Sequence, residues 1–218
     1  MKQDIKISLK CYKIVYSVTF MVLLALVRGV SSVREIGITL EMLIPPLAIV
    51  FCADTSYQET ADGRWEVFRL YPQGKQRCVI YRRLACEVLF LVLMAAFGYG
   101  LFLLFQRPVT HGGNAWLMFW ESMAASGVGI LFFGCLSEWL VSRLNSLWGG
   151  IGICVILWQV LISSFSQKLP AALQLLGYSD NGGQGDSIRW VWGKLTALIL
   201  AALLMLFHTK IGKGKGIR

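Results

Sequence analysis

Six apolar stretches, each close to the length that crosses a lipid bilayer, dominate this sequence. A spanning α-helix needs about 20 mostly apolar residues to cover about 30 Å of hydrocarbon. We therefore predict an all-α integral membrane protein in which 1–218 form a single transmembrane domain with six transmembrane helices. The predicted spans are 11–27, 36–52, 84–105, 115–136, 147–163 and 191–208.

The composition supports lipid as the main solvent of this chain. Hydrophobic residues make up 56% of it and charged residues only 15%, whereas a soluble domain carries about 25% charged residues. The net charge of +9 would suggest nucleic acid in a soluble protein. In a membrane protein, basic residues collect on the cytoplasmic side, near anionic headgroups. We therefore expect the bilayer as a partner and no nucleic acid.

The positions of the basic residues predict the orientation. If both termini are cytoplasmic, most of the 21 Lys and Arg residues lie inside, in the N-terminal segment, in 53–83 and in the C-terminal tail. This bias follows the positive-inside rule. It predicts a multi-pass protein with both ends in the cytoplasm and an even number of spans.

The second predicted span contains a helix-breaking pair, Pro45 and Pro46. Proline removes a backbone donor and kinks a helix, and membrane helices tolerate this where neighbours satisfy the freed carbonyl groups. We expect a kinked span, with a re-entrant hairpin as the alternative.

Carboxylates within spans are costly and often functional. Glu41 and Glu121 are both predicted one to two turns below the outer surface, where they line a water-filled cavity or reach the headgroups. We treat both as candidate pathway residues. Glu87 is predicted one turn above the inner surface, close to Arg82 and Arg83, in an interfacial salt bridge.

The chain lacks the common catalytic motifs. It has no GxxxxGK[ST] phosphate loop, no HExxH and no GxSxG. Its two histidines, His111 and His208, lie at opposite surfaces in this topology, so we expect no shared metal. Its six cysteines form no CxxC pair and are interpreted as small apolar residues. We predict that the chain is not an enzyme and holds no metal or cofactor.

Two connections are long. In the cytoplasmic connection 53–83, Tyr57, Ala61, Trp65 and Phe68 recur at helical spacing on one face, and Pro72 ends the pattern. Such an amphipathic helix either lies in the headgroup layer or docks a cytoplasmic partner.

The outer connection 164–190 holds a short apolar part, 169–178, that suggests an interfacial helix or a re-entrant turn.

The stretch Gly63 to Pro72 resembles the loop between the second and third helices of ABC-2 type transporter permeases. The family pattern is roughly G-T-x-E-x-L, then a proline and a basic helix. Gly63, Glu66, Phe68 and Pro72 match it, and Arg64 stands at the threonine position. The basic lead into the third helix is matched by Lys75, Arg77, Arg82 and Arg83.

The resemblance implies the permease subunit of an ABC exporter in a bacterial plasma membrane. It would work with a second permease, the same or a related chain, and with cytoplasmic ABC ATPase subunits that bind ATP and Mg. Its substrate would be a peptide, a drug or a lipid-like molecule. A membrane-embedded enzyme and a passive membrane assembly factor remain alternatives. The implied ATPase-coupling residues are Tyr57, Ala61, Gly63, Trp65, Glu66, Phe68 and Pro72.

Overall fold

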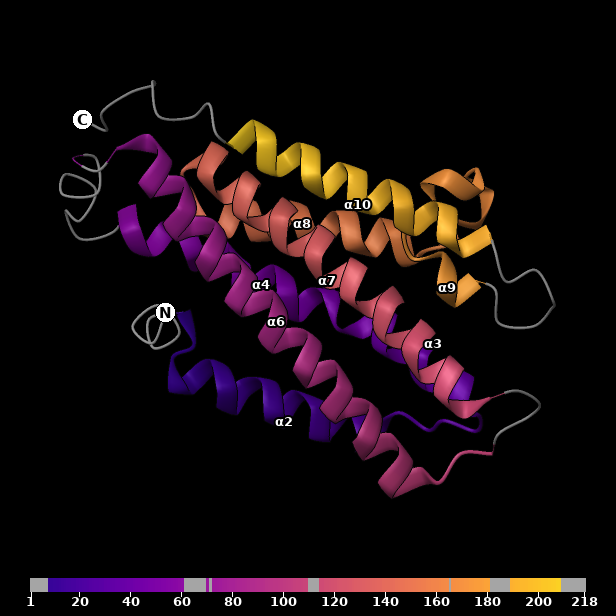
Figure 1. The fold of residues 1–218 in the computed structure, drawn as a ribbon. Helices are drawn as coiled ribbons and strands as arrows, with labels where there is room; N and C mark the ends of the chain where they lie inside the picture. Colours follow the sequence, from indigo (N-terminus) through magenta and orange to yellow (C-terminus); the bar gives the residue numbers. More distant parts are fainter. Residues whose placement is uncertain are drawn as a thin grey trace.

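The computed structural model describes residues 8–60, 70, 72–109, 114–164, 166–180 and 189–208, and in this part of the chain every named element is a helix. The main helices pack into one elongated bundle (Figure 1). The main helices are α2 (Cys11–Val27), α3 (Val33–Leu43), α4 (Pro45–Thr60), α6 (Gln73–Gln106), α7 (Ala115–Leu144), α8 (Leu147–Ile162) and α10 (Arg189–His208). Three short helical turns lie between α8 and α10: η2 (Ser166–Lys168), η3 (Ala171–Leu173) and α9 (Gly177–Asp180).

Successive helices run in alternating directions, with α3 and α4 together making one crossing of the bundle. Helices α2, α6 and α8 begin at one end, where α4, α7 and α10 finish (Figure 1). We call this the proximal end. The opposite end, where α2 finishes and α10 begins, is the distal end. There, Ser32 and Val109 form an isolated parallel bridge that joins the α2–α3 connection to the segment after α6.

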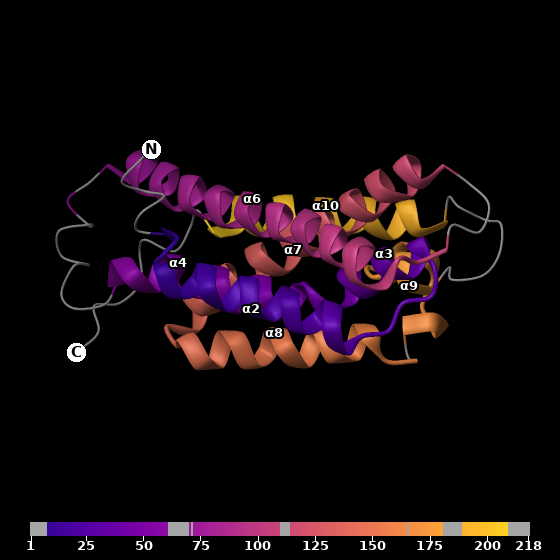
Figure 2. The ribbon, with the colours of Figure 1, turned by 90° about the horizontal axis from the view of Figure 1, so that it is seen from below.

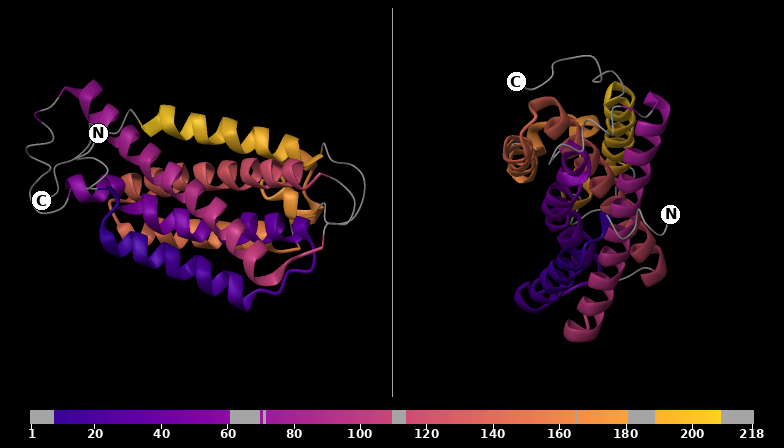
Figure 3. Two further views of the ribbon diagram at one scale, coloured as in Figure 1. Left: turned by 60° about the horizontal axis from the view of Figure 1, so that its bottom comes forward. Right: turned by 90° about the vertical axis from the view of Figure 1, so that its left-hand side faces the viewer.

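Helices α4 and α7 form the centre of the bundle. Helix α7 contacts α3, α4, α6, α8 and α10. Viewed from below and along the bundle, α8 lies on one side and α6 with α10 on the other (Figures 2 and 3). Ile44, Ile130 and Phe133 are 0% exposed, so the core follows α3, α4 and α7 along the bundle.

The prediction of an all-helical fold is confirmed for the described residues, and their long apolar helices are compatible with a multi-pass membrane protein. Four helical segments among the described residues are long and apolar enough to cross a membrane: Val33–Thr55, Gly74–Gln106, Ala115–Leu144 and Trp190–Phe207. Helices α2 and α8 are also apolar but have 17 and 16 residues, or about 25 Å of length. The six-span topology stays a prediction.

The second predicted span is interrupted at its prolines, as expected. Helix α3 finishes at Leu43, and α4 begins at Pro45. Helical hydrogen bonding resumes directly after the break: the amide groups of Leu47 and Ala48 donate to the carbonyl of Ile44 at 2.9 and 3.2 Å. The chain therefore bends here but continues across the bundle, and Val33–Thr55 remains one candidate span.

Helices α7 and α8 are joined by only two residues. Asn145 adopts a left-handed conformation, with φ of 48°, which asparagine tolerates better than most residues. Ser146 then caps α8, since its side chain accepts from the amide of Gly149 at 3.2 Å. The chain reverses direction in this joint and lays α8 against α7.

Candidate functional site

Several charged side chains lie inside the bundle beside its apolar core, and many large apolar side chains face outward. On α6, for example, Leu89 and Leu93 are 63% and 60% exposed. Five acidic or basic side chains on the described helices are at most 4% exposed: Lys13, Glu41, Glu87, Glu138 and Lys194. A soluble protein shows the reverse arrangement. Charges buried among apolar membrane helices are costly and mark functional positions.

Lys13 is at the centre of the first group of buried charges, at the proximal end. Its Nζ lies 2.7 Å from Oδ1 of Asp54 and 2.8 Å from Oε1 of Glu87. The same ammonium donates to the carbonyl of Phe51 at 2.9 Å. Thr55 completes the group by donating to Oε2 of Glu87 at 2.6 Å. We call Lys13, Asp54, Thr55 and Glu87 the Lys13 cluster.

The Lys13 cluster connects three helices. Lys13 comes from α2, Asp54 and Thr55 from α4, and Glu87 from α6. Lys13 lies on the buried face of α2, which repeats every fourth residue through Ser17, Met21 and Ala25. This spacing places the ammonium toward α4 and α6. Two carboxyl groups therefore share one ammonium in this cluster.

Glu87 was expected to pair with Arg82 and Arg83, its neighbours on the same helix. The partner that the structure gives it is Lys13, 74 residues away in the sequence. Position 87 shares a helical face with positions 83 and 84. The ion pair of Glu87 is nevertheless formed with Lys13 of α2. The ion pair therefore links helices rather than turns of one helix.

The second group of buried charges lies toward the distal end, where Lys194 of α10 pairs with Glu41 of α3. Its Nζ also donates to the carbonyl of Leu175 at 2.9 Å. Leu175 precedes α9, in the outer connection between α8 and α10. A single ammonium thus attaches this connection to the helices beneath it.

Tyr178 of α9 lies within the electrostatic reach of both predicted pathway carboxylates. Burial raises the pKa of Tyr178 to about 12, and the charges of Glu121 and Glu41 add to that rise. Its ring meets Trp190 edge to face at 5.3 Å. The prediction that Glu41 and Glu121 lie at the same end is in keeping with this. Glu41 is fully buried in an ion pair, whereas Glu121 is partly exposed.

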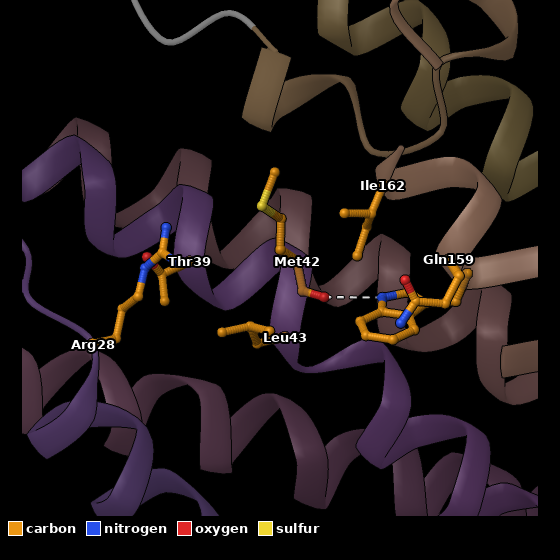
Figure 4. A pocket seen from close by; sticks show the side chains of 7 residues that line it. Arg28, Thr39, Met42, Leu43, Gln159 and Ile162 are labelled. Carbon is orange, nitrogen blue, oxygen red and sulfur yellow. Dashed lines mark hydrogen bonds between the residues drawn. The ribbon is translucent and has the colours of Figure 1, made fainter. Parts of the chain in front are cut away.

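A groove of about 200 Å³ opens at the distal end between α2, α3 and α8. Figure 4 shows Arg28 beside Thr39 on one side and Gln159 on the other, with Met42 and Leu43 between them. Neither Glu41 nor Glu121 lines it. We call it the distal groove; its lining residues are Arg28, Thr39, Met42, Leu43, Trp158, Gln159 and Ile162.

The predicted coupling residues fall mostly on a part of the chain that the structure does not describe. Ala61, Gly63, Trp65, Glu66 and Phe68 lie outside the described residues. Tyr57 belongs to α4 by its backbone, in the last turns of that helix. Pro72 immediately precedes α6 as its N-cap residue. The two described helix ends that flank these residues, at Thr60 of α4 and Gln73 of α6, both lie at the proximal end of the bundle.

Sequence reasoning missed several of the buried charges. Lys13 and Lys194 lie within predicted spans but were not predicted to pair with carboxylates, and Asp54 was predicted in the cytoplasmic connection 53–83. Glu138 was missed because the fourth span was predicted to stop at 136, whereas α7 continues to Leu144. The four-residue repeat in α2 was the one signal that pointed to Lys13. In the described ranges, no group of three His, Cys, Asp or Glu side chains is arranged to hold a metal ion.

Comparison with known proteins gives no relative for this chain: no family model, no curated protein and no solved structure matches it.

Proposed function

We propose that this chain is the membrane-spanning permease subunit of an ATP-driven ABC exporter. The observation that carries the proposal is a helical bundle with an apolar exterior and with ion pairs buried near both of its ends. Buried charges in membrane helices mark the routes of ions and substrates. They also provide contacts that can exchange when helices move.

In this proposal all six apolar helices cross the plasma membrane of a bacterial cell, and both termini are cytoplasmic. The substrate, a peptide, a drug or a lipid-like molecule, crosses between this chain and a second permease. Glu121 faces that pathway at the outer end, whereas Glu41 is buried behind it and would reach the pathway only when its ion pair with Lys194 opens. The chain itself performs no catalysis, because the energy comes from partner ATPase subunits that bind ATP and Mg.

The segment between α4 and α6 is the proposed contact with the ATPase. Trp65 and Phe68 would fill an apolar groove of the partner, and Glu66 would meet a donor beside it. The Lys13 cluster supports this role by its position: Asp54 and Thr55 lie on α4 ahead of the segment, and Glu87 lies on α6 after it. Movement of the segment would then reach α2 through Lys13.

The first experiment tests the coupling segment. We expect that Trp65→Ala with Phe68→Ala leaves the chain inserted but detaches the ATPase, or uncouples ATP hydrolysis from transport. Buried aromatic anchors often contribute about 2 kcal/mol, or roughly a thirtyfold change in affinity. The measurement is co-purification of the co-expressed ATPase and vanadate-sensitive hydrolysis, each normalised to inserted chain. The control pair is Tyr12→Ala with Tyr16→Ala, which removes exposed aromatics from α2.

Equal ATPase recovery in the parent, the test pair and the control pair would remove the segment from the mechanism. A second experiment tests the topology by cysteine labelling, after the exposed Cys11 and Cys78 are changed to Ser. Thr60→Cys should resist an impermeant reagent applied to intact cells, and Gly183→Cys should react with it. Labelling of position 60 from outside would reverse the orientation and reject the docking proposal.

A further inference from the structure

We propose that the distal groove binds one anionic glycerophospholipid, with the lipid phosphate on Arg28 and the upper part of an acyl chain along Met42, Leu43 and Ile162. This proposal concerns a binding site on the side of the bundle. It does not depend on whether the chain is a transporter subunit.

The size of the groove decides what class of molecule it can hold. Pockets for drug-sized ligands enclose about 300–1,000 Å³, whereas the distal groove encloses about 200 Å³. It is also open at the side of the bundle rather than closed by helices. A headgroup and the first part of one chain match this size, while the rest of the lipid stays in the bilayer.

Arg28 supplies the positive charge and is held at a defined position. It follows α2, and its carbonyl accepts from Nε2 of Gln106 at 2.6 Å. The same amide nitrogen donates to Ala25 at 2.8 Å, and Oε1 of Gln106 accepts from the amide of Val30 at 2.6 Å. One glutamine of α6 therefore fixes the backbone on both sides of Arg28. The exposed guanidinium remains available at the rim with its five donors.

Trp158 forms one wall of the groove and is held in place by a hydrogen bond. Trp158 cannot rotate freely, since its indole nitrogen donates to the carbonyl of Met42 at 3.0 Å (Figure 4). Leu43 and Ile162 are partly exposed beside it and present an apolar floor. A charged rim above an apolar floor, at a helix end, matches a phosphate above an acyl chain.

The charge pattern favours an anionic lipid over a zwitterionic one. A phosphatidylcholine carries an ammonium beside its phosphate, which would lie near Arg28 and weaken the attraction. Glu35 is the acidic side chain that competes for Arg28: it lies close enough for the two charges to act on each other, and it accepts from the amide of Ser31 at 2.8 Å. Removal of the Glu35 charge should therefore strengthen lipid binding, while removal of Arg28 should weaken it.

The test is native mass spectrometry of the full chain in a neutral detergent, titrated separately with dioleoyl phosphatidylglycerol and dioleoyl phosphatidylcholine. The parent should bind one phosphatidylglycerol in preference to phosphatidylcholine. Arg28→Gln should weaken the phosphatidylglycerol complex about fivefold, the effect of one basic residue at a membrane surface, and leave phosphatidylcholine unchanged. Glu35→Gln should tighten the phosphatidylglycerol complex. Excess inorganic phosphate should not displace the lipid.

Two further variants make the result specific to the groove. Arg107→Gln removes another exposed arginine at the distal end, outside the groove lining, and should leave the preference intact. Ile162→Trp fills the groove without a change of charge and should abolish the preferred site. The proposal is overturned if Arg28→Gln and Arg107→Gln have equal effects, or if Glu35→Gln fails to tighten binding. It is also overturned if Ile162→Trp changes only the oligomeric state, because a second copy of the chain would then occupy the groove.

Discussion

The indole nitrogen of Trp158 donates a hydrogen bond of 3.0 Å to the carbonyl oxygen of Met42. In an unbroken helix this oxygen would accept from the amide four residues later, but that residue is Pro46, which has no N–H. Helix α8 thus supplies the donor that the proline removed. The break between α3 and α4 and the packing of α8 are parts of the same arrangement.

We predict that the cost of removing the Trp158 donor depends on Pro46. Trp158→Phe should destabilise the detergent-solubilised chain by about 1 kcal/mol, because a partly buried carbonyl loses its partner. In a Pro46→Ala background, the new amide can serve Met42, so the same change should cost less. The measurement is the melting temperature, with the fraction of folded chain that remains after heating determined by size-exclusion chromatography.

Trp148→Phe is the matched control, because Trp148 lies in the same helix and is 79% exposed. It should leave the melting temperature unchanged. Equal losses for Trp158→Phe in the parent and in the Pro46→Ala background would contradict the shared role of the two residues.

A second prediction concerns the Lys13 cluster. Lys13→Met leaves Glu87 charged and buried without its ammonium, and breaking a buried pair in this way costs about 3–5 kcal/mol. For a chain of this size the melting temperature should fall by about 10 °C. Lys13→Met combined with Glu87→Gln should recover part of the loss, since the unpaired charge is then gone. Lys10→Met, at an exposed position, is the control; a similar loss there would argue against a specific cluster.

A third prediction separates the two candidate pathway carboxylates. Glu41→Gln removes the charge that Lys194 pairs with inside the bundle, so stability should fall by about 3 kcal/mol. Glu121→Gln changes a partly exposed side chain and should alter stability by less than about 0.5 kcal/mol. If Glu121 lines the pathway, transport per folded chain should nevertheless change in this variant. Unchanged transport with unchanged stability would remove Glu121 from the pathway.

A fourth prediction tests the close approach of α7 and α8. A Cβ atom at Gly150 would lie 2.4 Å from Cγ2 and 2.9 Å from the backbone nitrogen of Val141. Backbone cannot yield as a side-chain tip can, so Gly150→Ala should cost about 1–3 kcal/mol. Gly152→Ala is the control, because a Cβ there meets nothing within 4 Å. A melting temperature that falls equally in both variants would contradict this packing.

Sequence patterns predicted the helices well because bilayer length and hydrophobicity act on contiguous residues. The bounds predicted for α2 are those observed, and α8 differs from its prediction by one residue. The pairing of charges was predicted poorly. Lys13 and Glu87 meet because α2 and α6 are neighbours in the bundle. The apolar periodicity of a single helix does not predict which other helices will lie beside it. The same reason explains why the distal groove, formed by α2, α3 and α8, was not foreseen.

The partners of Lys13 lie far along the sequence, which affects the order in which the helices can enter the membrane during synthesis. Helix α2 is synthesised before α4 and α6, and Asp54 and Glu87 follow Lys13 by 41 and 74 residues. Until α4 and α6 have been synthesised, the ammonium lacks both of its counter-charges, and a lysine within a short apolar helix opposes its own entry into lipid. We therefore expect α2 to stay at the edge of the insertion machinery and to take its final place only when α6 arrives. Membrane integration of α2 would then be completed by the synthesis of a later helix.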